Sequence, residues 1–89
     1  MLIWTIEFDD KARRELRKLD KPIQKEILKY LRDKIATTES PKRYGKALSS
    51  NLAGLWRYRV RDYRIICNIE DNQLTVLVVR LAHRKQVYD

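Results

Sequence analysis

The stretch WRYRVR at residues 56–61 decides how this 89-residue chain folds, because bulky apolar residues alternate in it with arginines. A period of two is typical of a β-strand, in which successive side chains point to opposite faces of a sheet. We therefore expect Trp56, Tyr58 and Val60 to face a core and the three arginines to face the other side. Like charges crowded on one sheet face repel each other, so we expect a solvated anion such as phosphate there.

The residues around this stretch predict two more strands. Residues 55–61, 63–70 and 73–81 are rich in β-branched and aromatic residues, and tight turns are expected at Arg61-Asp62 and at residues 70–73. These three strands would form an antiparallel meander. We expect residues 41–54, which precede it, to form a loop.

The N-terminal half predicts one strand and two helices. Residues 2–8 alternate like a strand, and Asp9 or Asp10 can cap the helix that follows. Asp20 and Pro22 are typical of the start of a second helix, which should end between residues 37 and 41. The apolar residues expected to face the core are Ala12, Leu16 and Leu19 in the first helix, and Ile23, Ile27, Tyr30, Leu31 and Ile35 in the second.

The predicted order is therefore β-α-α-β-β-β. It indicates an α+β fold in which two N-terminal helices pack on one face of a small, largely antiparallel sheet. The length predicts one domain, residues 1–89, with a small core.

Composition limits the function classes. Lys and Arg number 20 against 12 acidic residues, and the formal charge of +8 favours nucleic acid or an acidic protein as partner. A basic domain with no nucleic-acid role is the alternative. The single cysteine, Cys67, lies in an apolar run and is expected to be a core residue. We expect a cytoplasmic protein, because we find no signal peptide and no stretch of the ~20 apolar residues that span a membrane.

Motifs of several common enzyme classes are absent from the sequence, including nucleotide-binding glycine loops, zinc patterns and nucleophile elbows. What remains is a set of cations and proton carriers. Phosphodiester transfer in RNA needs little more, because the 2′-OH is an internal nucleophile and arginines neutralise the phosphoryl oxygens. The candidate catalytic residues are Arg57, Arg59, Arg64, Arg84, His83 and Tyr88.

Several of these residues have simpler interpretations. Arg61 is also expected as a surface charge beside a turn, and His83 as an orienting or ordinary surface residue. Tyr88 lies next to the C-terminus, where chains fray. Arg80 is expected in an edge-strand salt bridge. The alternation with arginines favours a core position for Trp56 and Tyr58 over base stacking.

The order of motifs along the chain resembles the RelE family of toxins from type II toxin–antitoxin pairs, within the wider RelE/ParE superfamily. The resemblance covers nearly the whole chain. The matching stretches are FD at residues 8–9, KAL at 46–48, GLWRYRV at 54–60, DYRI at 62–65, AHR at 82–84 and VY at 87–88.

The resemblance implies a microbial-RNase-like fold and a ribosome-dependent endoribonuclease that cuts mRNA in the ribosomal A site. Cleavage would use the 2′-OH and leave a cyclic phosphate and a 5′-OH, without a metal or other cofactor. The implied partners are the ribosome with its rRNA, the mRNA, and an acidic, partly disordered cognate antitoxin that folds over the helices and the basic groove. No membrane partner is expected.

The resemblance also assigns roles to residues. Arg57, Arg59, Arg64, Arg84 and Tyr88 match the family's catalytic positions, and we expect Lys46 and Arg61 to contact RNA beside them. Some family members have lysine at the strand positions, one of which can act as general base. Arginine does not lose its proton in proteins, so we expect Tyr88 or His83 to carry protons in this chain.

Three alternatives stay open at the sequence level. The chain also fits a ParE-like toxin that inhibits DNA gyrase, a nucleic-acid-binding module without catalysis, and a degenerate toxin that only binds its antitoxin. The complete set of arginines with Tyr88 favours the ribonuclease, because a gyrase inhibitor has no need of a phosphate cluster.

Overall fold

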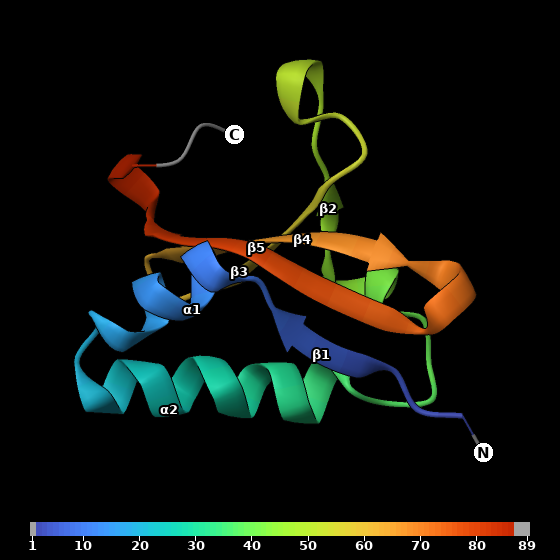
Figure 1. Ribbon diagram of the computed structural model, residues 1–89, viewed down its shortest axis with the longest axis horizontal. Helices are drawn as coiled ribbons and strands as arrows, with labels where there is room; N and C mark the ends of the chain where they lie inside the picture. The colour runs from blue at the N-terminus through green and yellow to red at the C-terminus, as the bar shows by residue number, and fades with distance from the viewer. Residues whose placement is uncertain (1, 87–89) are drawn as a thin grey trace.

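The structure is a computed structural model that describes residues 2–86, and it confirms the predicted fold class. Two helices pack on one face of a five-stranded sheet with the strand order β1-β5-β4-β3-β2 (Figure 1). Strand β1 runs parallel to β5, and the other neighbours are antiparallel. The elements are β1 (Thr5–Phe8), α1 (Asp10–Arg17), α2 (Lys21–Tyr30), β2 (Lys46–Ala47), β3 (Trp56–Val60), β4 (Tyr63–Glu70) and β5 (Thr75–His83).

Strand β1 is shorter than the sequence predicts. Its register pairs Thr5 with Thr75 and Phe8 with Val78, so the sheet has no partner for residues 2–4. The backbone N–H of Trp4 instead donates to the carbonyl of Thr37, in the loop after α2 (2.9 Å). Because β5 begins only at Thr75, the strand pattern before Thr5 has no ladder to join.

The two helices begin where the sequence predicts. The carboxylate of Asp9 accepts a hydrogen bond from the N–H of Ala12 (2.8 Å), which caps α1. Asp20 holds the same position before α2, but its side chain makes no capping bond. After Tyr30 the helix widens into one π turn, Leu31–Ile35, and so ends slightly earlier than predicted.

The core lies between the helices and one face of the sheet. The predicted helix stripe is confirmed at Ile27, Leu31 and Ile35, which are buried, and Ile23 and Tyr30 pack partly buried beside them. The sheet contributes the buried side chains of Tyr58, Val60, Ile65, Cys67, Val76, Val78 and Leu81. The predicted core positions are confirmed for Tyr58 and Val60, which are buried, while Trp56 is only half-buried.

The segment before β3 is more regular than the predicted loop. It contains a 3-10 turn at Pro41–Tyr44, strand β2, and a second 3-10 turn at Ser50–Leu52. The hydroxyl of Tyr58 donates to the carbonyl of Pro41 (2.6 Å), and a Cβ on Gly45 would lie 3.1 Å from the Tyr58 ring. This packing holds β2 against β3. Two residues are too few for a strand pattern to be recognised in a sequence.

The last strand begins later and ends later than predicted. Residues Asp71–Gln73 form a 3-10 turn, and Leu74 takes a positive φ of 48°, so β5 starts at Thr75. It continues to His83, which pairs with Tyr63 of β4. Among the described residues, no helix is both long and apolar enough to cross a membrane.

Candidate nucleic-acid interface

The strand register brings four of the predicted cations onto one face of the sheet. Arg59 lies directly opposite Arg64 in the β3–β4 pair, and Arg57 lies directly opposite Lys46 in the β2–β3 pair. Directly opposed residues of neighbouring strands share a face. The face that carries these side chains is opposite to Tyr58 and Val60, which contact the helices, and we call it the basic face.

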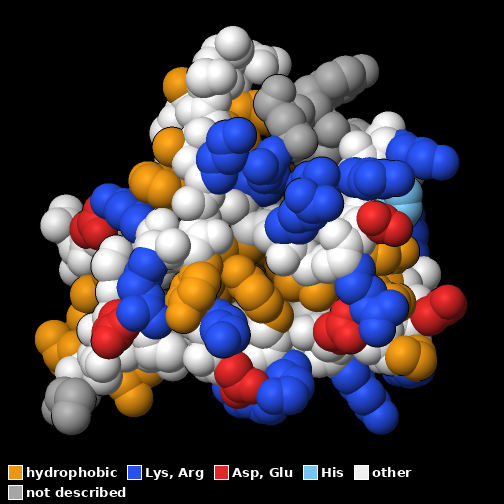
Figure 2. Space-filling model, turned by 180° about the vertical axis from the view of Figure 1, so that it is seen from behind, with side chains coloured by type: hydrophobic (Ala, Val, Ile, Leu, Met, Phe, Trp, Pro, Cys, Tyr) orange, Lys and Arg blue, Asp and Glu red, His pale blue; other side chains and the backbone are white. Residues whose placement is uncertain are grey.

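Two segments rise on either side of the basic face. In Figure 1, α2 lies beneath the sheet, while the loop after β2 and the turn after β5 rise from the opposite side. Figure 2, the view from behind, shows Lys and Arg side chains gathered in a row below the rising loop. Lys and Arg side chains thus gather on the side of the sheet from which these two segments project.

Burial makes Arg64 unlike the other cations of this face. Its side chain is only 7% exposed, while Arg59 opposite is exposed and Arg57 is half-buried. Ile66 and Ala82, its neighbours on the same face by register, are buried at 3% and 5%. Two arginines side by side on one face offer several N–H donors in the same direction, and arginines form charge-assisted hydrogen bonds to phosphate oxygens.

Arg84 is held beside the basic face by the turn between β3 and β4. Its backbone N–H donates to the carbonyl of Asp62 (2.6 Å), and its Nε lies 3.7 Å from Asp62 Oδ1. The predicted turn at Arg61-Asp62 therefore has a second role that sequence reasoning missed. Only Asp62 itself could have indicated this contact, and one exposed aspartate in a turn is common in any sequence.

Lys46 and Arg57 line a small cavity at the base of the rising loop. Its volume is about 260 Å³, and Ala47, Leu48 and Ser49 complete its wall. No carboxylate belongs to this lining. The predicted RNA contact at Lys46 is therefore placed next to Arg57, through a strand that the sequence did not reveal.

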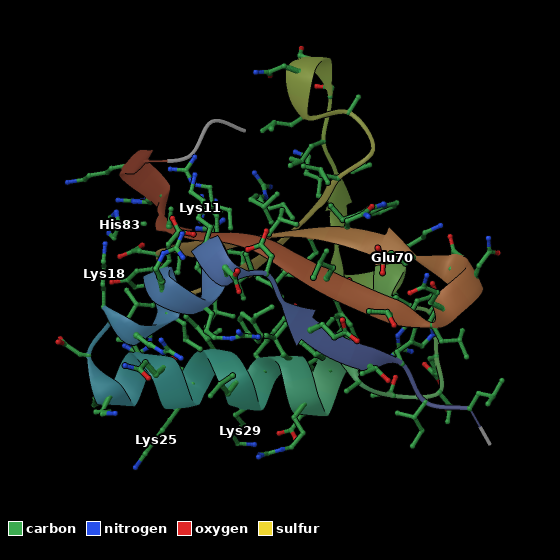
Figure 3. All side chains as sticks on the ribbon, viewed as in Figure 1. Lys11, Lys18, Lys25, Lys29, Glu70 and His83 are labelled. Carbon is green, nitrogen blue, oxygen red and sulfur yellow. The ribbon has the colours of Figure 1, made fainter. Side chains whose placement is uncertain are left out.

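His83 lies on the other side of the sheet from these cations. By register it shares the helix face with Tyr63. The two rings pack edge to face, with their centres 5.5 Å apart. Its Nδ1 accepts a hydrogen bond from the N–H of Lys85 (3.3 Å). It lines a cavity of about 300 Å³ with Glu15 and Lys18 of α1, and Figure 3 shows His83 and Lys18 at the same end of the molecule. The structure thus does not bring His83 together with Arg59 and Arg64.

Arg61 also departs from the arginine row. The alternation predicts it on the face of Arg57 and Arg59, but it lies in the turn with a positive φ of 53°. Its guanidinium forms an ion pair with Glu26 of α2, and this carboxylate raises the pKa of Arg61. The strand geometry ends at Val60, so the period of two no longer sets the direction of the next side chain. The interpretation as a turn-side surface charge is the better one.

Tyr88, the remaining predicted site residue, lies outside the described residues. Arg80 makes the predicted salt bridge, with Glu15 of α1 (3.7 Å), but β5 is not an edge strand. Pairing with β1 stops at Val78, and α1 continues along β5 from there: Glu15 also accepts a hydrogen bond from the N–H of Leu81 (2.8 Å).

Two buried groups can be set aside as nucleophiles. Burial raises the pKa of the Cys67 thiol far above its ordinary value, so the reactive thiolate is not formed near neutral pH. Burial likewise raises the pKa of Tyr58, whose hydroxyl is bound to the carbonyl of Pro41. Within residues 2–86, no three His, Cys, Asp or Glu side chains are grouped as metal ligands would be.

Comparisons with known proteins show the family to which the chain belongs. A family model described as the ParE toxin of the type II toxin-antitoxin system, parDE, matches residues 6–88. Toxin RelG of Mycobacterium tuberculosis is 33% identical over 85 residues, which cover 96% of this chain and 95% of RelG.

Solved structures give the same result. The toxin–antitoxin complex RelBE2 of Mycobacterium tuberculosis matches with a TM-score of 0.85 and 33% identity over 94% of each chain. The isolated RelE toxin of E. coli matches with a TM-score of 0.71 over 90% of this chain and 83% of that chain; at 20% identity this likeness shows the fold alone. The chain therefore belongs to the RelE/ParE superfamily of toxins from type II toxin–antitoxin systems.

Proposed function

We propose that this toxin is a ribosome-dependent endoribonuclease that cleaves mRNA in the ribosomal A site. The observation that carries the proposal is the pair of directly opposed arginines, Arg59 and Arg64, of which Arg64 is buried. Two guanidinium groups on directly opposed strand positions can bind the same phosphate through charge-assisted hydrogen bonds. RNA is chosen as the anion because the sequence motifs resemble the RelE family, and the 33% identity to Toxin RelG supports a toxin of that kind.

In the proposed reaction, the 2′-oxygen of the cut nucleotide forms a bond to phosphorus, and the bond from phosphorus to the 5′-oxygen breaks. The products are a 2′,3′-cyclic phosphate and a 5′-OH. Arg64 and Arg84 stabilise the charge that develops on the phosphoryl and leaving oxygens, and electrostatic stabilisation of this kind usually contributes most to the rate. Arg57 and Arg59 hold the RNA backbone so that the 2′-oxygen, the phosphorus and the 5′-oxygen lie in line. Lys46 binds the adjoining part of the RNA.

Two protons must move in this reaction, one from the 2′-OH and one to the 5′-oxygen. Arginine carries neither, because its guanidinium stays protonated. We assign both transfers to Tyr88, which takes the proton from the 2′-OH and returns it to the 5′-oxygen. His83 acts only as a positioning residue, through the contact of its ring with Tyr63 on the far face of the sheet. The assignment predicts that Tyr88→Phe abolishes cleavage while His83→Gln keeps most of it.

The test is induced expression in a bacterial host, followed by mapping of 5′ ends on a reporter mRNA with an intact or a disabled start codon. Cuts inside codons that need translation, and that vanish in Arg84→Ala, are expected. Lys25→Ala is the matched control, since Figure 3 shows Lys25 projecting from α2 away from the sheet. Wild-type cleavage by both Arg84→Ala and Tyr88→Phe would contradict the assigned roles.

Inhibition of DNA gyrase is a second candidate function. The matching family model is that of ParE toxins, which favours it. Growth arrest without any mRNA cuts, together with loss of supercoiling by purified gyrase in the presence of the toxin, would select this function over the ribonuclease.

We also propose that a cognate antitoxin neutralises the toxin, because relatives of known structure include toxin–antitoxin complexes. The docking site that fits such a partner is an apolar groove of about 450 Å³ between β1 and α2. Trp4, Ile6, Phe8 and Leu28 line it, and β1 is an edge strand of the sheet. Of these side chains Leu28 is exposed and Ile6 and Phe8 are half-buried, and an apolar groove beside a free strand edge is the kind of surface on which proteins dock.

Leu28 tests the docking site, since its side chain lines the groove and is 44% exposed. Leu28→Asp should keep its toxicity but should no longer be rescued when the antitoxin is expressed with it. Lys25→Ala, on the same helix, should still be rescued. Full rescue of Leu28→Asp would place the antitoxin elsewhere.

A further inference from the structure

A groove with six charged side chains in its lining lies beside the edge of the sheet. It lies between α2 and β3 and has a volume of about 380 Å³. Strand β2 pairs only with Trp56 and Arg57, so the outer edge of β3 beyond them carries no strand. Arg59 belongs to both places, because it lines this groove and also lies opposite Arg64 on the basic face.

The groove carries a net positive charge. Its charged lining residues are Lys29, Lys34, Arg59, Arg61, Glu26 and Asp33. Both carboxylates are already engaged, Asp33 by Lys29 and Glu26 by Arg61. The Lys29 and Arg32 side chains also lower the pKa of Asp33 through hydrogen bonds, Lys29 most strongly. In the part of the chain that the structure describes, no carboxylate pairs with Lys34 or Arg59, so these two cations remain for an anionic ligand.

An exposed aromatic ring lies next to Lys34, one of the residues that line the groove. Tyr44 is 43% exposed, the one aromatic side chain among residues 2–86 that stands out as exposed. The Lys34 Nζ lies 5.6 Å from the centre of its ring, and the Arg43 guanidinium lies 4.7 Å from it. Arg43 also donates to the Tyr44 hydroxyl (3.0 Å) and pairs with Glu39. These contacts hold the ring in place and leave part of its surface open.

We infer that the α2–β3 groove is a track for single-stranded RNA, which continues from the cut nucleotide at Arg59 past Lys34 to a base stacked on Tyr44. This inference rests on the proposed ribonuclease function. A positively charged groove that follows the backbone, with aromatic rings on which bases stack, is how proteins bind single strands without sequence preference. The groove supplies the first element and Tyr44 the second, on a surface continuous with the basic face.

RNAs of two lengths distinguish binding to the basic face from binding to the groove, because only a long RNA can reach from the basic face to Tyr44. All proteins carry Arg84→Ala to suppress cleavage, and binding of labelled RNAs of about 4 and about 12 nucleotides is followed by fluorescence anisotropy. The long RNA should bind more tightly than the short one. Tyr44→Ala should lower the affinity for the long RNA at least about fivefold, which is the loss expected for one stacked base. The affinity for the short RNA should stay the same.

Three further variants complete the experiment. Lys34→Ala should also weaken only the long RNA, Tyr44→Phe should bind like the parent because its ring still stacks, and Lys25→Ala should bind like the parent because it lies outside the groove. Unchanged affinity for the short RNA shows that each variant is folded. Equal binding of the two lengths by the parent, or an equal change for both lengths in Tyr44→Ala and Lys34→Ala, would overturn the inference.

The two proposals fail in different ways. Reporter mRNA cuts without any length dependence of binding would overturn the groove and leave the ribonuclease function in place. Length-dependent binding that is lost in Tyr44→Ala, without reporter cuts, would support the groove as an RNA track and overturn the cleavage.

Discussion

Arg64 shows how a single position combines the demands of fold and function. The sequence places it near the start of a strand, where an exposed charge would be ordinary, but its side chain is 7% exposed. It lies between Arg59 of β3 and Ala82 of β5, its directly opposed neighbours. A guanidinium in that position has its fork fixed by packing, so little further ordering is needed when phosphate arrives.

Replacement of Arg64 should therefore affect cleavage more than folding. Arg64→Ala is expected to lower kcat/KM by about 30-fold or more, equivalent to about 2 kcal/mol of transition-state stabilisation. Arg64→Lys should recover only part of the loss, because an ammonium cannot form the bidentate contact. Single-turnover cleavage on programmed ribosomes measures both, and a thermal melt checks folding. Activity of Arg64→Ala within twofold of wild type would remove Arg64 from the mechanism.

Because of Cys67, the free energy of unfolding should fall as the pH rises into the alkaline range. Burial raises the pKa of its thiol, so the folded chain keeps a proton that the unfolded chain loses above about pH 8.5. The stabilisation is complete below that pH and falls as pH rises, by up to about 1.4 kcal/mol per pH unit. Urea unfolding between about pH 7.5 and pH 10 should show a steeper decline for wild type than for Cys67→Ala. Parallel declines would contradict this.

At the scale of elements, the two helix starts form a natural comparison. Asp9 and Asp20 occupy the same position before α1 and α2, and the sequence suggests a cap at both. Only Asp9 makes the capping hydrogen bond, to the N–H of Ala12. The second helix instead starts with proline in its first turn, which restricts the backbone and needs no N–H partner.

The difference predicts unequal costs of substitution. Asp9→Ala should lower the free energy of unfolding by about 1 kcal/mol, the usual value for a lost side-chain cap. Asp20→Ala should cost less than half as much, because it removes a favourable charge at the helix end but no hydrogen bond. Urea denaturation at neutral pH measures both variants. An equal or larger cost at Asp20 would show that the capping bond is not the source of the effect.

At the scale of the whole molecule, the basic face and the apolar groove lie in different places. The cations of the basic face lie on one side of the sheet, and the apolar groove lies between β1 and α2 on the other. A net charge of +8 on 89 residues attracts both RNA and an acidic protein. An antitoxin that covers the apolar groove would still approach the toxin under the influence of the whole charge.

The association rate with the antitoxin should therefore depend on salt. Stopped-flow mixing should show a fall of at least about tenfold between low salt and about 0.5 M salt, because mobile ions screen long-range attraction. The dissociation rate should change much less, since it depends on apolar contacts in the groove. A salt-independent association rate would mean that net charge does not steer the encounter.

The sequence by itself determined the order of the two helices and of β1, β3, β4 and β5, the helix stripe and the two faces of β3. These follow from local periodicity: a period of two or of 3.6 sets which side chains share a face, and capping residues and turns mark the ends. The family resemblance, carried by stretches such as GLWRYRV, was also readable from the chain. What was predicted correctly depends on neighbours close in sequence.

Only the tertiary structure decided which of the candidate residues share a surface. The register of β4 places Arg64 opposite Arg59, while His83 points to the helix face and Arg61 turns to Glu26. Lys46 reaches Arg57 through a two-residue strand held by the Tyr58 hydroxyl. Register, burial and the direction of turn residues depend on contacts between distant segments, and a one-residue shift in register would move every side chain to the other face.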